Sequence, residues 1–130
     1  DLFLKEGQLN FIKGIKVISE ISFFKKESWL EELKLLSSGP LSSQTGSIAF
    51  LIVGKIDESY FDEINNFFKK FYKNNNNAVI QNLHESIDYE SIVLIASLGK
   101  TTNREIENLK NKIHIQKKPI LGLIALSDII

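Results

Sequence analysis

The chain of 130 residues contains no cysteine and no methionine, and it has only two prolines and two histidines. The absence of cysteine excludes disulfide scaffolds, iron–sulfur clusters, cysteine-ligated zinc and thiol nucleophiles. The two histidines, His84 and His114, give no convincing zinc site, so mixed histidine and carboxylate ligation is the only zinc chemistry left. We therefore expect no metal, and because no Gly-x-Gly-x-x-Gly motif is present either, we expect no cofactor.

The sequence also has no net charge, because 16 Lys and Arg residues balance 16 Asp and Glu residues. Nucleic-acid-binding proteins usually carry a basic excess, so we expect no nucleic-acid partner. The longest apolar runs, residues 48–53 and 120–126, are much shorter than the roughly 18–20 residues of a membrane-spanning helix. Residues 1–25 give no signal-peptide pattern. Because the chain begins at Asp1 and lacks methionine, we expect a piece of a longer protein, with any membrane anchor outside this window.

Apolar residues make up 43% of the chain and charged residues 25%, which is typical of one globular domain covering residues 1–130. Short apolar runs alternate with segments of helical periodicity. The pattern predicts strands at 15–21, 48–53, 78–83, 92–98 and 120–126, with the longest helix at 58–73. Strands separated by helices favour an α/β fold with three layers, a mostly parallel sheet and a P-loop or Rossmann-like topology.

Three short motifs resemble the capping boxes that begin helices. They pair Ser28 with Glu31, Ser59 with Asp62, and Thr102 with Glu105. The first predicted helix ends at Gly39-Pro40, and residues 41–47 (LSSQTGS) form a polar loop of the kind that links elements or covers a site.

Two Gly-Lys turns follow predicted strands, where parallel sheets bind their ligands. A P-loop needs a further glycine five residues earlier, but those positions hold Ala49 and Leu94 inside strands. If a nucleotide does bind, the candidate residues are Gly54, Lys55, Gly99, Lys100 and Thr101.

Catalytic groups are scarce near these turns. The third and fourth strands end in Gln81-Asn82 and Ser97-Leu98, without the carboxylate that would hold magnesium. His84 lies close to Glu85, Ser86 and Asp88, but catalytic triads normally converge from separate segments, so we expect a solvated loop histidine. We therefore assign no catalytic residue.

Residues 91–126 (SIVLIASLGKTTNREIENLKNKIHIQKKPILGLIAL) resemble the C-terminal part of bacterial polysaccharide tyrosine autokinases. In that family an apolar strand, a Gly-Lys-Thr turn and a helix lead to a strand of the type Pro-Val-Leu-Gly-Val-Val-Leu-Asn, which residues 119–126 (PILGLIAL) match. Residues 14–22 (GIKVISEIS) are similar to the segment that follows the second membrane helix of polysaccharide chain-length determinants.

The departures from that family concern its catalytic parts. Residues 54–59 (GKIDES) stand where the family has its P-loop, and Gln81-Asn82 stands in place of its magnesium-binding aspartate. Leu126 or Ser127 replaces the asparagine associated with the nucleotide base, and the tyrosine-rich tail is not in this window. The resemblance thus implies the fold and a role beside capsule or exopolysaccharide export, without kinase activity.

The leading expectation is a non-catalytic cytoplasmic interaction or regulatory domain of a protein that controls polysaccharide chain length and export. Its partners would be proteins or further copies of itself, through residues Phe23, Phe24, Trp29, Thr101, Thr102 and Arg104. The alternatives are a kinase-like, ATP-dependent enzyme with a non-standard phosphate site and a small-molecule sensor of flavodoxin-like form.

Overall fold

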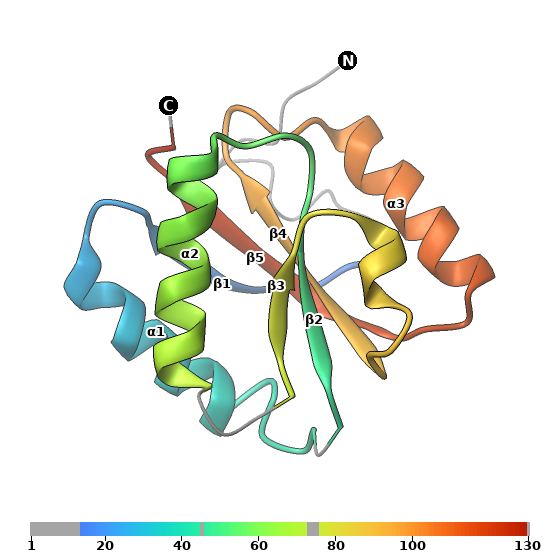
Figure 1. Cartoon of the computed structure of the whole chain (residues 1–130), viewed down its shortest axis with the longest axis horizontal. Helices are drawn as coiled ribbons and strands as arrows, with labels where there is room; N and C mark the ends of the chain where they lie inside the picture. Colours follow the sequence, from blue (N-terminus) through green and yellow to red (C-terminus); the bar gives the residue numbers. More distant parts are fainter. Residues whose placement is uncertain (1–13, 45, 73–75, 130) are drawn as a thin grey trace.

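The computed structural model describes residues 14–44, 46–72 and 76–129 of the chain. Its centre is a five-stranded sheet with the order β1-β5-β4-β2-β3, in which every neighbouring pair is parallel (Figure 1). The strands are β1 (Val17–Ser22), β2 (Ile48–Ile52), β3 (Ala78–Ile80), β4 (Ser91–Ser97) and β5 (Ile120–Ser127). The predicted α/β fold is therefore confirmed, and the described sheet is wholly parallel.

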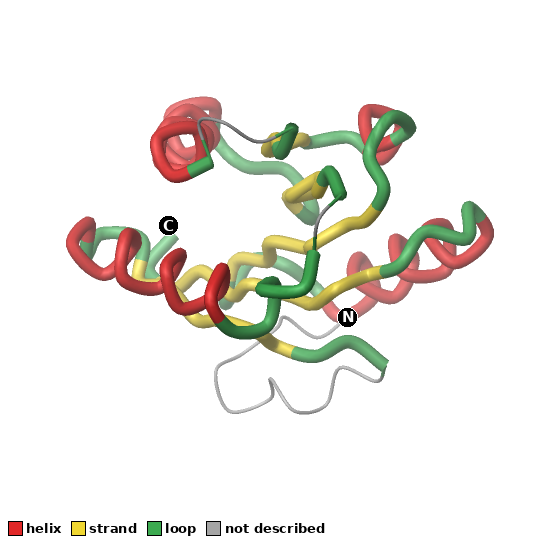
Figure 2. Tube along the Cα trace, turned by 90° about the horizontal axis from the view of Figure 1, so that it is seen from below, coloured by secondary structure: helices red, strands yellow, loops and turns green. Residues whose placement is uncertain are grey.

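Helices cover both faces of this sheet. Helices α1 (Lys26–Ser38) and α2 (Glu58–Phe71) pack on one face, and α3 (Asn103–Ile115) packs on the other. Seen from below, the strands form the middle layer between them (Figure 2). Every residue of β2 and β4 is buried, which explains why these strands are continuous apolar runs without alternation.

The α1–α2 side of the core is aromatic. The Trp29 ring stacks on Phe67 with centroids 4.8 Å apart, and its indole nitrogen donates to the Phe23 carbonyl at 3.0 Å. Phe68 of α2 lies on Phe50 of β2, with centroids 4.7 Å apart. Stacked and tilted ring pairs each add about 0.5–1.5 kcal/mol beyond area burial, so this cluster fixes both helices on the sheet.

The connections divide at the middle of the sheet. From β2 the chain passes through α2 to β3 on one side, whereas from β4 it passes through α3 to β5 on the other side. The switch point of the topology, where doubly wound sheets bind ligands, therefore lies between β2 and β4. The order β3-β2-β4-β5 matches the 2-1-3-4 order of flavodoxin-like sheets, with β1 in fifth place. The expected Rossmann-like topology is not confirmed.

Two of the three predicted caps are wrong. Helix α1 begins at Lys26, and the Ser28 hydroxyl donates to the Lys25 carbonyl at 2.7 Å instead of capping the helix. Helix α2 begins at Glu58 without a side-chain cap, so Ser59 lies inside the helix. At the start of α3, Thr102 and Glu105 form the predicted reciprocal capping box.

The strand expected over 78–83 ends at Ile80, and the chain continues into the short 3-10 helix η2 (Leu83–Ser86).

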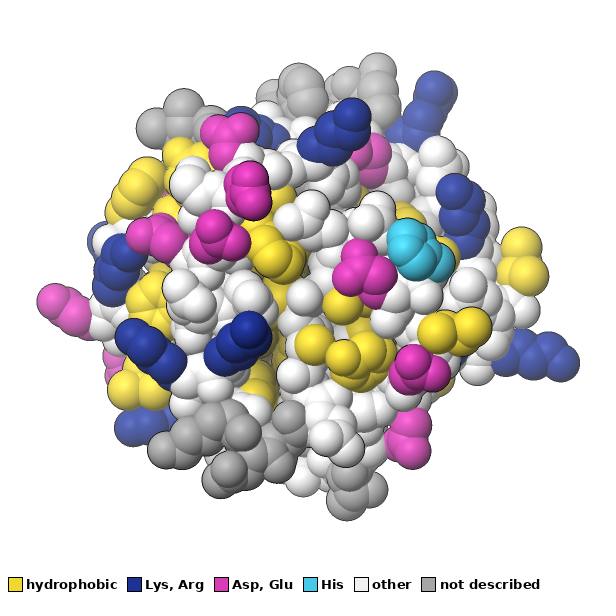
Figure 3. Space-filling model, viewed as in Figure 1, with side chains coloured by type: hydrophobic (Ala, Val, Ile, Leu, Met, Phe, Trp, Pro, Cys, Tyr) yellow, Lys and Arg dark blue, Asp and Glu magenta, His cyan; other side chains and the backbone are white. Residues whose placement is uncertain are grey.

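Charges on α2 follow the helix dipole. Figure 3 shows acidic side chains over the upper end of α2 and basic side chains over its lower end, which are its N- and C-terminal ends. Glu58 lies in the first turn, and Lys69 and Lys70 lie in the last, where each charge is mildly stabilising.

No helix in the described ranges has both the length and the apolar character needed to cross a membrane.

Candidate functional site at the carboxyl edge of the sheet

The two Gly-Lys turns predicted from the sequence come together at the switch point. Strands β2 and β4 pair in parallel, with Ile52 opposite Ile95. The turns at Gly54-Lys55 and Gly99-Lys100 therefore leave the same edge of the sheet on neighbouring strands. Both lysine side chains are exposed. Two cations on either side of a switch point are the arrangement that would attract an anionic ligand.

Both turns need glycine because of their backbone. Gly54 has φ 79° and Gly99 has φ 81°, in the left-handed region that favours glycine. The space around them differs. A Cβ atom at Gly99 would meet no atom within 4 Å, whereas a Cβ at Gly54 would lie 2.6 Å from Oε2 of Glu105.

Glu105 thus has two functions at the start of α3. Its Oε1 accepts hydrogen bonds from the Thr102 backbone nitrogen at 3.0 Å and from the Thr102 hydroxyl at 3.2 Å. Its other oxygen, Oε2, lies against Gly54 on the neighbouring turn. The capping box therefore places a carboxylate in the space left by the missing Gly54 side chain.

This carboxylate changes the chemistry of the switch point. In phosphate-binding loops, glycine lets a phosphate approach the backbone nitrogens at a helix N-terminus. Here Glu105 occupies the space beside Gly54 and interacts favourably with the α3 N-terminus. A phosphate at this place would have to displace the carboxylate or accept its repulsion.

Thr101 is committed to the turn itself. It is buried, and its hydroxyl accepts a hydrogen bond from the Ser97 backbone nitrogen at 2.8 Å. Its own backbone nitrogen donates to the Ser97 carbonyl at 2.8 Å. In a P-loop the corresponding hydroxyl binds magnesium, but here it holds the β4–α3 turn together.

Carboxylates do not gather at the other strand ends. Gln81 and Asn82 are exposed after β3, and the Asn82 amide donates to Oε1 of Glu85 at 3.1 Å. Asp128, after β5, accepts a hydrogen bond from the Ser22 hydroxyl at 2.6 Å. Among the described residues, no group of three histidine, aspartate or glutamate side chains could hold a metal ion.

The histidine candidates lie in solvent. His84 is exposed in η2, and His114 is exposed in the last turn of α3. Ser86, the serine of the hypothetical triad, is buried, and its hydroxyl donates to the Leu83 carbonyl at 2.6 Å. These contacts give Ser86 a structural role in η2.

The expected contact residues divide between core and surface. Phe23 and Trp29 are 2% and 0% exposed, and Thr101 is also buried, so these three side chains lie inside the domain and are not available for surface contacts. Phe24 is 54% exposed and contacts Phe23 edge-to-face. Arg104 is exposed on α3. Thr102 is half-buried in its capping box.

Phe24 lies beside a recess at the start of α1. Its volume is about 480 Å³, and its lining residues are Phe24, Lys25, Lys26, Glu27, Ser28 and Glu31. The recess therefore combines one apolar ring with charges of both signs. Such a lining is better suited to binding the polar surface of another protein than to binding a small apolar ligand.

Two features of the structure were missed in the sequence. The contact between Glu105 and Gly54 joins residues 51 positions apart. The sequence signals this contact through the Thr102–Glu105 capping motif alone. That motif predicts the start of a helix but does not reveal that Glu105 will lie against Gly54. The second feature is a cavity at the amino edge of the sheet, to which the polar loop 41–47 contributes.

No protein-family model, curated protein or solved structure matches the chain.

Proposed function

We propose that this chain is a non-catalytic α/β domain that acts by binding to other proteins. The observation that carries the proposal is the position of Glu105, whose carboxylate fills the space beside Gly54 at the switch point. A domain that used this edge for phosphoryl transfer would need that space for a phosphate and its metal ion. The chain instead uses the residues there to cap α3 and to close the β4–α3 turn.

The surface around Phe24 is the contact site that this proposal favours. The ring is 54% exposed although it adjoins the aromatic core, and the charged recess at the start of α1 lies beside it. A large exposed aromatic ring with a polar rim is typical of a protein interface. The partner would be another protein or a second copy of this chain.

The biological setting in this proposal rests on the resemblance alone. The likeness of residues 14–22 and 91–126 to polysaccharide chain-length determinants and tyrosine autokinases supports a regulatory role in exopolysaccharide or lipopolysaccharide chain-length control and export. The cytoplasmic location, and attachment to a membrane through a segment outside this chain, belong to the same proposal.

Nucleotide binding is the second candidate. It is favoured by Lys55 and Lys100, which flank the switch point on neighbouring turns. This function requires Glu105 to leave Gly54 when the phosphates enter. Nucleotide binding therefore predicts an open space beside Gly54, whereas the non-catalytic protein-binding domain predicts that Glu105 stays there.

Calorimetric titration with ATP and ADP, with and without Mg²⁺, distinguishes the two candidates. The non-catalytic proposal predicts no binding heat down to millimolar affinity. Magnesium-dependent binding would overturn it, and Lys55→Ala and Lys100→Ala would then identify the turn that holds the phosphates. Lys34→Ala, which changes an exposed lysine of α1, is the matched control.

A further inference from the structure

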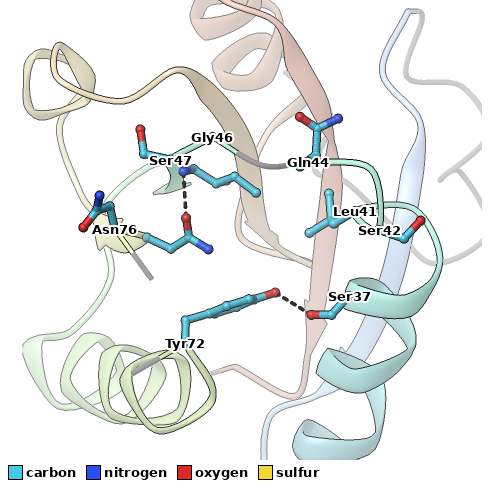
Figure 4. A pocket seen from close by; sticks show the side chains of 10 residues that line it. Ser37, Leu41, Ser42, Gln44, Gly46, Ser47, Tyr72 and Asn76 are labelled. Atoms are coloured by element: carbon cyan, nitrogen blue, oxygen red, sulfur yellow. Dashed lines mark hydrogen bonds between the residues drawn. The ribbon is translucent and has the colours of Figure 1, made fainter. Parts of the chain in front are cut away.

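A cavity of about 370 Å³ opens at the amino edge of the sheet, opposite the switch point. It lies where α1 and α2 end and where β2 and β3 begin. Ser37 and Tyr72 come from the two helix ends, whereas Ser47 and Asn76 come from the segments before the strands (Figure 4). The volume falls within the range of about 300–1,000 Å³ that is usual for small-molecule sites.

Most of the described lining residues carry neutral hydrogen-bonding side chains, whereas Leu41 and Ile48 are apolar. The hydroxyls and amides belong to Ser37, Ser42, Ser47, Gln44, Asn76 and Asn77. None of the described lining side chains is charged. Hydroxyls and amides both donate and accept hydrogen bonds, so this lining suits a ligand that also does both.

Two of these groups are held in place by internal hydrogen bonds. Oδ1 of Asn77 accepts a hydrogen bond from the Ile48 backbone nitrogen at 2.8 Å, which leaves the two amide hydrogens as donors. The Tyr72 hydroxyl lies 3.2 Å from the Ser37 hydroxyl (Figure 4). Burial raises the pKa of the Tyr72 phenol, so the group stays protonated to a higher pH than an exposed tyrosine.

The hollow continues toward η2. An adjoining depression of about 350 Å³ shares Ser47, Asn76 and Asn77 with the first and extends to Asp88 and Tyr89. The two together form a polar trough, which we call the amino-edge trough.

The charges around the trough decide which class of ligand it fits. An anion would need a lysine or arginine, but the charged side chain among the described lining residues is Asp88. Glu90 adds a second carboxylate nearby, because its side chain lies against Gly46. These two carboxylates are too few for a divalent cation, because no group of three acidic or histidine side chains among the described residues could hold a metal ion. An apolar ligand would need a mostly apolar wall.

We propose that the amino-edge trough binds a neutral polyhydroxylated small molecule, such as a mono- or disaccharide. The amides of Gln44, Asn76 and Asn77 and the serine hydroxyls bond the ligand hydroxyls, and Asp88 accepts from hydroxyls at the far end. This site is independent of the carboxyl edge, so it stands or falls separately from the proposed protein-binding function.

The test is an amide-resolved NMR titration of the whole chain with three probes: N-acetylglucosamine, maltose and glucose 6-phosphate. We expect the two neutral sugars to give saturable shifts at residues 37–44, 46–48, 76–77 and 88–89. Glucose 6-phosphate should bind more weakly than the neutral sugars, because the carboxylates of Asp88 and Glu90 repel its phosphate group.

Substitutions locate the site. Gln44→Ala and Asn76→Ala change exposed lining residues and should each weaken sugar binding about fivefold, the usual effect of losing one neutral hydrogen bond. Gln44→Trp should block the trough. Gln81→Ala, on the opposite edge of the sheet, is the matched control and should bind normally.

Two results would overturn the proposal. The first is the absence of shifts at the trough with both neutral sugars up to the highest soluble concentration. The second is glucose 6-phosphate binding as tightly as the neutral sugars, which would show that the lining does not select a neutral ligand.

Discussion

Gly54 and Gly99 are equivalent in the sequence but not in the structure. Each follows a buried strand and precedes a lysine, and each has a positive φ close to 80°. Gly99 faces open space, whereas Gly54 faces the Glu105 carboxylate. Gly99 is therefore required only by the left-handed backbone of its turn. Gly54 is required by the backbone and also because a side chain there would collide with Glu105.

Alanine at the two positions should separate these effects. Gly99→Ala should cost about 1 kcal/mol of unfolding free energy, which is the penalty of the left-handed backbone. Gly54→Ala should cost about 2–3 kcal/mol, because it also displaces Glu105 from its cap. Urea denaturation measures both values. Equal losses would mean that Glu105 does not lie against Gly54.

Tyr72 predicts a dependence of stability on alkaline pH. Burial raises the pKa of its phenol above 10.0, and the Ser37 hydrogen bond opposes this only in part. Above pH 10 the unfolded chain loses this proton while the folded chain keeps it, so the phenol lowers the unfolding free energy as pH rises.

Tyr72→Phe removes this titration. Near neutral pH the variant should be less stable by about 1 kcal/mol, because the bond to Ser37 is lost. Above pH 10 the wild-type and variant stabilities should converge, as measured by denaturation at several pH values. Curves that stay parallel would show that the phenol titrates alike in both states.

At the scale of elements, the same sequence motif has different outcomes at three helices. Thr102 caps α3, but Ser28 and Ser59 lie within the first turns of α1 and α2, which begin two residues and one residue earlier, respectively. In those two helices the serines follow Lys25 and Asp57, the residues that take the cap position. A short polar motif therefore predicts that a helix begins nearby, but not the residue at which it begins.

This difference is measurable as a change in stability. Thr102→Ala should cost about 1 kcal/mol, and up to 2, because it removes one half of the capping box and loosens Glu105. Ser59→Ala should change the unfolding free energy by less than about 0.5 kcal/mol, since its side chain is exposed and caps nothing. Similar losses in both variants would contradict the assigned helix starts.

At the scale of the whole molecule, the apolar runs were sufficient to predict the fold class. Strands β2 and β4 are buried on both faces, so their continuous apolar residues indicated a covered parallel sheet. The strand order could not be predicted in this way, because the apolar pattern of a strand does not show which other strands pair with it. The Glu105–Gly54 contact and the amino-edge trough depend on that order, and the sequence did not reveal them.

The sheet order predicts where the structure opens last. β4 pairs with β2 and with β5, whereas β1 and the three-residue β3 lie at the edges. Amide hydrogen exchange should therefore be slowest in β4 and β2 and faster in β3. Protection of β3 amides equal to that of β4 would contradict this sheet order.

Under the proposed function, the Glu105 carboxylate beside Gly54 keeps phosphates away from the switch point of the sheet. The most direct test is a titration of the chain with Mg²⁺ and ATP, observed at the backbone amides of Gly54, Lys55, Gly99 and Lys100. We expect no saturable shift at these four amides. Saturable shifts at Gly54 and Gly99 together would place a nucleotide between the two turns and contradict it.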